Sequence, residues 1–356
     1  MSKFHNFIQP FKPYLPGLFP EPPTKPNYPN ETFQYDTQAW GSHKDGNYVM
    51  AYIPKREIPD IPQVIIYLHG FAFGNPYYYD AHMQHLAKQG YYVFFADYQK
   101  DKYTDSQTPQ PPRFGNSLKL LDAAIESLHT AGKDMITTAH ESVSKALQEV
   151  LPDKPTLDIF LFGHSLGGLF ALSWPFFNGT NQIKAIISAD PLPNTAELPS
   201  WIQDNINSDL PFLKYPVKIE ETGAALTNIP VAILLGNKDL FVKLKTWEQY
   251  WNDIAAFQKK IYISQTDYYY NIYRFDPQSA LIAYHNQSVT NELLADVDEN
   301  IQLLIGGAGK QDNMRWRFVW DALDKVLAGS SVEQLTFKMS SWSNGKAVQG
   351  VQSWPN

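Results

Sequence analysis

The sequence predicts an α/β fold in which helices cover both faces of a mostly parallel sheet. Short apolar runs rich in β-branched residues, such as Val64–Leu68 and Val231–Leu235, are typical of strands buried on both sides. Segments with apolar residues at helical spacing, such as Met135–Val150, lie between these runs. Alternation of this kind implies crossover connections and parallel strands. The 356 residues suffice for two domains or for one large domain with insertions.

The same patterns place the individual elements along the chain. The predicted strands are Asn47–Ile53, Val64–Leu68, Tyr91–Ala96, Leu157–Phe162, Ile183–Ser188, Val231–Leu235 and Lys260–Ser264. The predicted helices are Ala81–Lys88, Ser117–Thr130, Met135–Val150, Gly168–Trp174 and Lys245–Phe257. Residues 191–228 contain five prolines and are too long for an ordinary connection, so we expect an irregular insertion that is a candidate cap.

Proline content sets the ends of the chain apart from its centre. Residues 1–45 carry eight prolines, which disfavour helices and central strands, so this segment is expected to be an arm on the surface. We expect the α/β domain to occupy residues 46–330, with residues 331–356 as a C-terminal tail. The N-terminus lacks the continuous apolar stretch of a secretory signal, and no apolar run is long enough to span a bilayer. These features favour a cytoplasmic location, although a signal removed earlier would leave no trace.

Composition excludes several classes of function. The formal net charge is -7 and the isoelectric point is about 5.7, with acidic residues spread along the chain, so a nucleic-acid partner is not expected. The absence of cysteine excludes disulfides, thiolate zinc sites and a cysteine nucleophile. No metal or cofactor is expected.

The stretch LDIFLFGHSLGGL, residues 157–169, contains the strongest motif. A buried-type strand ends at Gly163-His164-Ser165-Leu166-Gly167, and a helical segment follows. This is the setting of a nucleophile elbow, in which a serine in strained backbone geometry needs neighbours without a Cβ atom. The alternative is an ordinary glycine turn, or a phosphate-binding loop that lacks its lysine. The strand–turn–helix context favours Ser165 as a nucleophile.

A nucleophilic serine requires a base and an acid that orients the base. Of the nine histidines, only His285 follows the motif, and the order serine, acid, histidine therefore selects it. Asp239 lies four residues after the strand Val231–Leu235 and is the favoured acid. Asp190, just after the preceding strand, is the alternative, although the prolines beside it direct it toward the insertion. In isolation, a single histidine such as His285 is commonly a polar residue at a helix end, and Asp239 could be an acid that hydrogen-bonds its own turn.

Two backbone N–H groups are predicted to bind the oxyanion of the reaction. One belongs to Leu166, at the start of the helix after the serine, and the other to Phe71, because His69-Gly70-Phe71 follows a strand as in HG-type oxyanion loops. Aromatic residues cluster after this loop and again before His285, and they either line a pocket or pack in the core. The pocket candidates are Phe73, Tyr77, His164 and Tyr268.

The motifs LHGF, FGHSLGG and LLGNKD, with a lone downstream histidine, resemble the α/β-hydrolase superfamily over most of residues 47–327. Within it, the chain is similar to lipases, esterases and dienelactone hydrolases, and in outline to cutinases and chlorophyllases. The resemblance implies an eight-stranded sheet with a small insertion between the sixth and seventh strands. Serine in the elbow argues against the dehalogenase and epoxide hydrolase branches, which use a carboxylate. The long gap before His285, the arm and the tail depart from the family pattern.

The resemblance also implies hydrolysis of a small-molecule or lipid-like carboxylic ester through an acyl-enzyme, without a cofactor. Two alternatives remain open at this point. One is acyl transfer or cofactor-free peroxidase chemistry on the same three residues, and the other is a binding protein that has the fold but no activity. The sequence leaves the natural ester and the oligomeric state undetermined.

Overall fold

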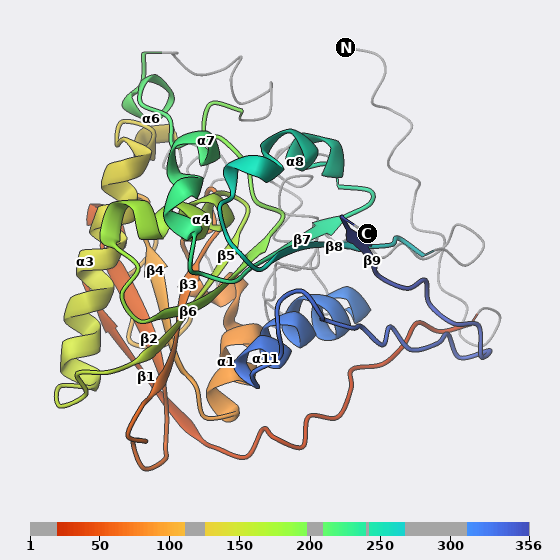
Figure 1. Cartoon of the computed structure of the whole chain (residues 1–356). Helices are drawn as coiled ribbons and strands as arrows, with labels where there is room; N and C mark the ends of the chain where they lie inside the picture. The colour runs from red at the N-terminus through yellow and green to blue at the C-terminus, as the bar shows by residue number, and fades with distance from the viewer. Residues whose placement is uncertain (1–19, 111–124, 198–208, 240–241, 268–311, 356) are drawn as a thin grey trace.

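A computed structural model of the chain describes residues 20–110, 125–197, 209–239, 242–267 and 312–355. The strands of this part form one sheet, shown in Figure 1. They are β1 Tyr35–Trp40, β2 Tyr48–Pro54, β3 Gln63–Leu68, β4 Tyr92–Asp97, β5 Asp158–His164, β6 Ile183–Ala189, β7 Val231–Gly236, β8 Lys259–Ser264 and β9 Gln352–Trp354. Their order across the sheet is β1-β2-β4-β3-β5-β6-β7-β8-β9.

Helices of several lengths connect these strands. The α-helices are α1 Asp80–Lys88, α3 Gly132–Val150, α4 Leu166–Asn178, α6 Pro211–Lys214, α7 Ile219–Thr222, α8 Leu244–Tyr250 and α11 Trp320–Leu327. Short 3-10 turns are η1 His43–Asp45, η2 Pro76–Tyr78, η3 Gly223–Leu226 and η4 Trp251–Asp253. The segment η6, Arg315–Val319, is a π-helical turn that leads into α11.

The sheet is parallel in its centre and antiparallel at its edges. Strand β3 pairs in parallel with both β4 and β5, and the parallel pairing continues through β6 and β7 to β8. Strands β1 and β2 at one edge and β9 at the other pair antiparallel with their neighbours. This arrangement confirms the prediction of a mostly parallel sheet.

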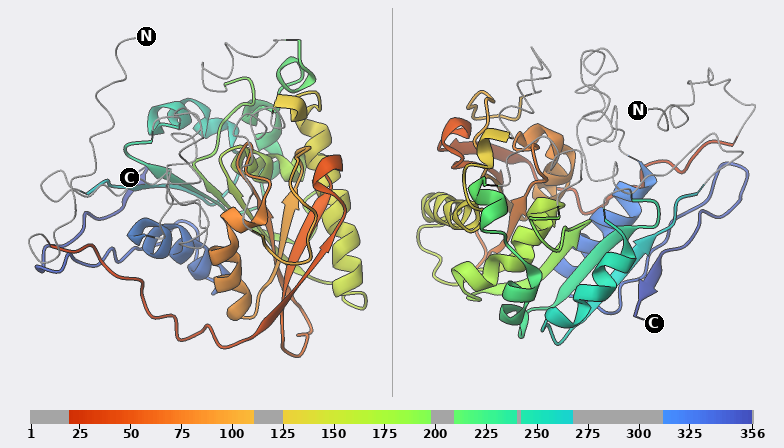
Figure 2. Two further views of the ribbon diagram at one scale, coloured as in Figure 1. Left: turned by 180° about the vertical axis from the view of Figure 1, so that it is seen from behind. Right: turned by 90° about the horizontal axis from the view of Figure 1, so that it is seen from above.

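Helices cover the two faces of the sheet, as predicted, and each face has its own core (Figures 1 and 2). Helices α1 and α11 pack on one face, where Leu86 and Leu323 are fully buried. Helices α3, α4 and α8 pack on the other, where Val143, Leu172 and Trp247 are almost fully buried. Among the described helices, none is long and apolar enough to cross a membrane.

The sheet of the described part has nine strands, whereas eight were expected. Strand β1 lies within the proline-rich arm, after its last proline, and β9 lies within the C-terminal tail. Both are edge strands with exposed or half-buried residues. They lack the continuous apolar run that marks a central strand, so their sequences carried little signal.

Four other predictions need correction or fall outside the described residues. Part of the segment 191–228, expected to be irregular, forms the short helices α6, α7 and η3. The helix expected over residues 245–257 ends with η4 at Asp253, because the chain turns extended at Ile254. Helix α4 begins at Leu166, earlier than expected. Most of the helix predicted over residues 117–130 lies outside the described residues.

Candidate active site

Ser165 occupies a sharp turn between β5 and α4. Its backbone angles are φ 52° and ψ -116°, a conformation that residues other than glycine rarely adopt. The strand ends at His164 and the helix begins at Leu166, so the turn consists of the serine alone. Such strain persists only where the surrounding structure enforces it, which makes Ser165 a candidate functional residue.

Two neighbouring glycines allow this turn. A Cβ atom on Gly163 would lie 2.1 Å from the carbonyl oxygen of Gly167, inside the first turn of α4. A Cβ atom on Gly167 would lie 2.4 Å from the carbonyl oxygens of both Leu68 and His69. The second contact brings α4 directly against the end of β3. The turn at Ser165 therefore sits beside the loop that begins at His69.

Backbone hydrogen bonds tie Ser165 to the ends of two further strands. The N–H of Ser165 donates to the carbonyl oxygen of Ala189, the last residue of β6, at 2.9 Å. The next residue, Asp190, donates from its N–H to the carbonyl oxygen of Leu234 in β7 at 2.8 Å. The carboxyl ends of these strands thus meet around the serine, as expected for a ligand site in a parallel sheet.

The loop after β3 contains a backbone N–H group, that of Phe71, with no acceptor in the described part of the chain. Gly70 donates to the Tyr79 hydroxyl at 2.9 Å, Ala72 to the Gln99 side-chain oxygen at 2.7 Å, and Phe73 to the Gly70 carbonyl at 3.0 Å. The N–H of Phe71 makes no such bond within that part. Because buried N–H groups are almost always paired, the Phe71 N–H is a candidate donor to a ligand.

His164, next to the serine, hydrogen-bonds to Tyr79. Its Nδ1 atom lies 2.9 Å from the Tyr79 hydroxyl, which also accepts the N–H of Gly70. That hydroxyl has one proton, so it donates to His164. Burial, reinforced by His69 and Arg315, lowers the pKa of His164 to about 3. His164 is therefore a neutral acceptor at physiological pH and is unsuited to be the base for Ser165.

The two candidate acids are both described and both buried. Asp239 follows β7 and is 5% exposed, and its Oδ1 accepts the backbone N–H of Val242 at 2.9 Å. Asp190 follows β6, is 4% exposed, and has a positive φ of 45°. Both therefore lie at the carboxyl edge of the sheet. His285, the candidate base, lies outside the described residues. The choice between Asp239 and Asp190 as its partner therefore stays a prediction.

The pocket candidates have different surroundings. Phe73 is buried and packs edge-on against Tyr78, with ring centroids 5.3 Å apart, while Tyr77 is partly buried against the core. Tyr268 lies outside the described residues. Two cavities of about 350 Å³ lie elsewhere in the described part, and Ser165 does not line either of them. They are lined by His129, Thr130, Ala131, Lys133, Asp134, Pro211 and Tyr215, and by Lys44, Lys100, Asp101, Lys102, Tyr103 and Glu126.

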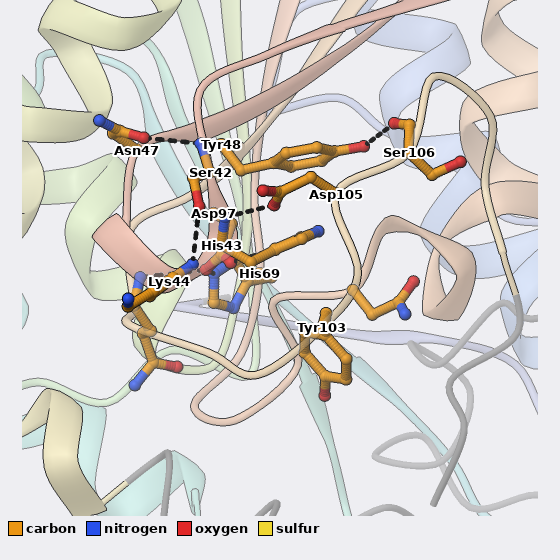
Figure 3. A network of polar contacts seen from close by, with 12 residues as sticks. Ser42, His43, Lys44, Asn47, Tyr48, His69, Asp97, Tyr103, Asp105 and Ser106 are labelled. Atoms are coloured by element: carbon orange, nitrogen blue, oxygen red, sulfur yellow. Dashed lines mark hydrogen bonds and ion pairs between the residues drawn. The ribbon is translucent and has the colours of Figure 1, made fainter.

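The structure reveals a buried polar network that the sequence analysis missed (Figure 3). Asp97 lies between two histidines, with Oδ2 2.6 Å from Nδ1 of His43 and Oδ1 3.1 Å from Nε2 of His69. Burial alone would raise the pKa of Asp97, but the hydrogen bonds from His43 and His69 lower it overall. A signal was present in the sequence, because His69 and Asp97 both stand at the ends of apolar strand runs. Parallel pairing of β3 with β4 makes those ends neighbours.

A second carboxyl group beside Asp97 behaves in the opposite way. Asp101 is 3% exposed, and neither of its side-chain oxygens has a hydrogen-bond partner in the described structure. Burial and the nearby charge of Asp97 raise the pKa of Asp101 well above its ordinary value. Asp101 therefore keeps its proton to a higher pH than Asp97. No group of three or more histidines and acids in the described residues is arranged to hold a metal ion.

Comparisons with known proteins find similarity in structure only. No protein-family profile matches the chain, and no curated protein matches it in sequence. Among solved structures, TT1662 from Thermus thermophilus has a TM-score of 0.43 and 17% identity over 64% of this chain and 89% of that one. Pyrococcus horikoshii acylaminoacyl peptidase has a TM-score of 0.46 and 18% identity over 66% of this chain and 36% of that one. Pyrococcus furiosus esterase Pf2001 has a TM-score of 0.44 and 16% identity over 69% and 88%, respectively.

The described sheet and the turn at Ser165 together define the fold class. A parallel sheet with β3 between β4 and β5, an antiparallel edge and helices on both faces surrounds a strained serine at the end of β5. The described residues therefore form an α/β-hydrolase fold.

Proposed function

We propose that this protein is a serine hydrolase that cleaves carboxylic esters through an acyl-enzyme. The observation that carries the proposal is the strained backbone of Ser165, held beside a loop whose Phe71 N–H has no acceptor in the described part. In the proposal, Ser165 is the nucleophile, His285 the base and Asp239 the acid. The N–H groups of Phe71 and Leu166 bind the oxyanion.

In this mechanism the hydroxyl oxygen of Ser165 attacks the ester carbonyl carbon while its proton passes to His285. The carbonyl oxygen becomes an oxyanion that accepts hydrogen bonds from the N–H groups of Phe71 and Leu166. The intermediate then expels the alcohol, which takes the proton from His285, and an acyl group stays on Ser165. Water, deprotonated by His285, attacks this ester and releases the acid. Asp239 supports the positive imidazole in both halves of the cycle.

Covalent labelling tests the nucleophile. We expect a fluorophosphonate probe to label the wild-type protein and the control Ser142→Ala, whose serine lies on α3 and bonds the backbone of Thr138. Ser165→Ala should take no label and should lose p-nitrophenyl ester hydrolysis. Full labelling of Ser165→Ala would refute the proposal.

A matched pair of variants tests the acid. If Asp239 supports His285, Asp239→Asn should lower kcat by roughly 10³- to 10⁴-fold, because an amide cannot stabilise the imidazolium and favours the wrong tautomer. Asp190→Asn should then lower kcat far less. The reverse result would assign the acid to Asp190 and leave the rest of the mechanism intact. Steady-state kinetics on one p-nitrophenyl ester measures both.

For the substrate we propose an ester with an apolar or aromatic group, as in carboxylesterases and lipases. Support comes from the aromatic residues Phe71, Phe73 and Tyr77 in the loop that adjoins Ser165. A series of p-nitrophenyl esters should show kcat/KM rising from acetate to longer or aromatic acyl groups. A preference for acetate would count against an apolar pocket.

A further inference from the structure

The peptide unit between Gly70 and Phe71 is held through its carbonyl oxygen. The Nδ1 atom of His69 lies 2.7 Å from the carbonyl oxygen of Gly70, and the N–H of Phe73 donates to the same oxygen at 3.0 Å. In a trans peptide the C=O and N–H groups point in opposite directions. Bonds to the Gly70 oxygen therefore set the direction of the Phe71 N–H and polarise it.

His69 itself has little freedom to move. Its side chain is fully buried, and its ring stacks on Tyr98 with centroids 4.1 Å apart and planes 7° apart. The Nε2 atom lies 3.1 Å from Oδ1 of Asp97. Both ring nitrogens thus face oxygen atoms. Because a carbonyl oxygen can only accept, Nδ1 carries the proton of the bond to Gly70.

Asp97 is held in turn by groups from two other segments. Its Oδ1 accepts the backbone N–H of Gln99 at 3.0 Å, and its Oδ2 lies 2.6 Å from Nδ1 of His43. The His43 ring stacks on Tyr48, with centroids 3.8 Å apart. Figure 3 shows His43, Asp97 and His69 gathered in one place. The row His43, Asp97, His69 and Gly70 therefore runs without a gap from η1 to the loop beside Ser165.

The remaining polar groups around Gly70 are also paired. The Tyr79 hydroxyl accepts the Gly70 N–H, and the Tyr98 hydroxyl donates to the His69 carbonyl oxygen. Neither contact involves the Gly70–Phe71 peptide unit. Among the side chains of the described part, His69 is the one that bonds the carbonyl of that unit.

We propose that His69, held by Asp97 and His43, is the positioning residue of the oxyanion site: its Nδ1–H bond to the Gly70 carbonyl aims and polarises the Phe71 N–H. The inference rests on the proposed function, because it assigns a role to a donor of that reaction. No proton or bond is exchanged, since His69 acts through the peptide unit alone. The proposal extends the active site by three side chains that do not touch the substrate.

Two substitutions at His69 separate its two contacts. The amide nitrogen of asparagine reaches the place of Nδ1 and can still donate to the Gly70 carbonyl, whereas that of glutamine reaches the place of Nε2 and can donate to Asp97. If His69 acts through its bond to the Gly70 carbonyl, His69→Gln should lower kcat more than His69→Asn does. If His69 only supports Asp97, His69→Asn should lower kcat more.

Ester kinetics gives the first readout. We expect His69→Gln to lower kcat by roughly 10- to 100-fold with KM within about twofold, because a misaimed oxyanion donor affects the transition state and not the bound substrate. His69→Asn should stay within about tenfold of wild type. Equal losses in both variants, or a loss carried by KM, would overturn the proposal.

The second readout does not depend on ester hydrolysis. In protein labelled with ¹⁵N-phenylalanine, the Phe71 amide resonance is identified by its loss in Phe71→Tyr. We expect it to shift in His69→Gln and to stay near its wild-type position in His69→Asn. An unmoved resonance in His69→Gln would overturn the inference even in an active enzyme. The two proposals can also fail separately. If Ser165→Ala keeps the full esterase activity while the Phe71 resonance still shifts in His69→Gln, the proposed function is refuted and the positioning contact stands.

His43 provides a third variant that leaves the loop itself intact. His43→Phe keeps a ring to stack on Tyr48 but removes the donor to Asp97. If the row acts as proposed, kcat falls by about 3- to 10-fold at unchanged KM and the Phe71 resonance shifts in the same direction as in His69→Gln. If the His69 variants do not fold, this variant decides alone, and wild-type values for both readouts would overturn the proposal.

Discussion

At the scale of single residues, the turn at Ser165 depends on two neighbouring glycines, which have no side chain. Gly163 and Gly167 have no Cβ atom, and the places where one would stand are taken by backbone of α4 and of the end of β3. This crowding holds Ser165 in its strained conformation, because the turn cannot relax without moving a helix or a central strand. The same contacts set the distance between the serine and the loop that carries Phe71.

Substitution of one glycine tests this packing. Gly163→Ala places a methyl group 2.1 Å from the Gly167 oxygen, so we expect a loss of about 1–3 kcal/mol in the free energy of unfolding. The matched control is Gly350→Ala, where a Cβ atom meets nothing within 4 Å. Chemical denaturation measures both variants. Equal stability of the two would show that the elbow can relax.

At the scale of elements, His85 joins three segments of the chain. It lies on α1, its Nδ1 is 2.8 Å from Glu31 ahead of β1, and its Nε2 is 2.9 Å from Asp324 on α11. Burial alone would lower the pKa of His85, but hydrogen bonds to Asp324 and Glu31 raise it overall above 6.5. Charged His85 therefore stabilises the packing of α1 against α11 and holds the proline-rich segment to both.

This pairing gives stability a defined dependence on pH. Because the folded pKa of His85 is raised, its contribution is complete below pH 6.5 and disappears as the pH rises through the folded value. Burial alone would raise the pKa of Glu31, but the bond from His85 lowers it overall, so the contribution of Glu31 is lost only as the pH falls below 4.5. The paired state is thus most stabilising between these two limits.

We expect His85→Gln to destabilise the protein most near pH 6, by about 1.5–3 kcal/mol, and progressively less toward pH 9. The control His140→Gln should show the opposite trend at its own site, because burial lowers the pKa of His140 and its neutral form is favoured in the fold. Thermal melts of the three proteins between pH 5 and 9 provide the test. A His85→Gln effect that grows with pH would contradict the assignment.

At the scale of the whole molecule, the C-terminal segment completes the sheet and one of its two cores. Strand β9 pairs antiparallel with β8. Four further residues of the tail, Val332, Leu335, Met339 and Val348, are buried in the core that contains α1 and α11. Trp342 is 1% exposed in that core and donates from its indole N–H to Asp267 at 3.0 Å. The described tail is therefore part of the folded domain.

Removal of the tryptophan side chain tests this role. Trp342→Ala should lower the free energy of unfolding by about 3–5 kcal/mol, because it leaves a cavity and removes a bond to the buried Asp267. Lys338→Ala, at an exposed position of the same segment, should change stability by about 0.5 kcal/mol or less. Denaturant titration separates the two outcomes, and a mild Trp342→Ala effect would mean that the tail is not structural.

The sequence by itself determined the central strands, their parallel arrangement and the elbow. Each of these depends on a local pattern: an apolar run, a helical spacing, or glycines on either side of a serine. The same local patterns left the edge strands β1 and β9 unpredicted, because an edge strand has no continuous apolar run. Asp239 and His285 remain predictions as partners of Ser165, because His285 lies outside the described residues.

Tertiary structure alone decided which buried polar groups meet. His43, His69 and Asp97 are up to 54 positions apart in the chain and come together because β3 and β4 are parallel neighbours and η1 closes over their ends. Tertiary structure also showed that the N–H groups of Gly70, Ala72 and Phe73 are paired while that of Phe71 has no acceptor in the described residues. Hydrogen-bond partners depend on where distant segments come to rest, and no local pattern of residues encodes that.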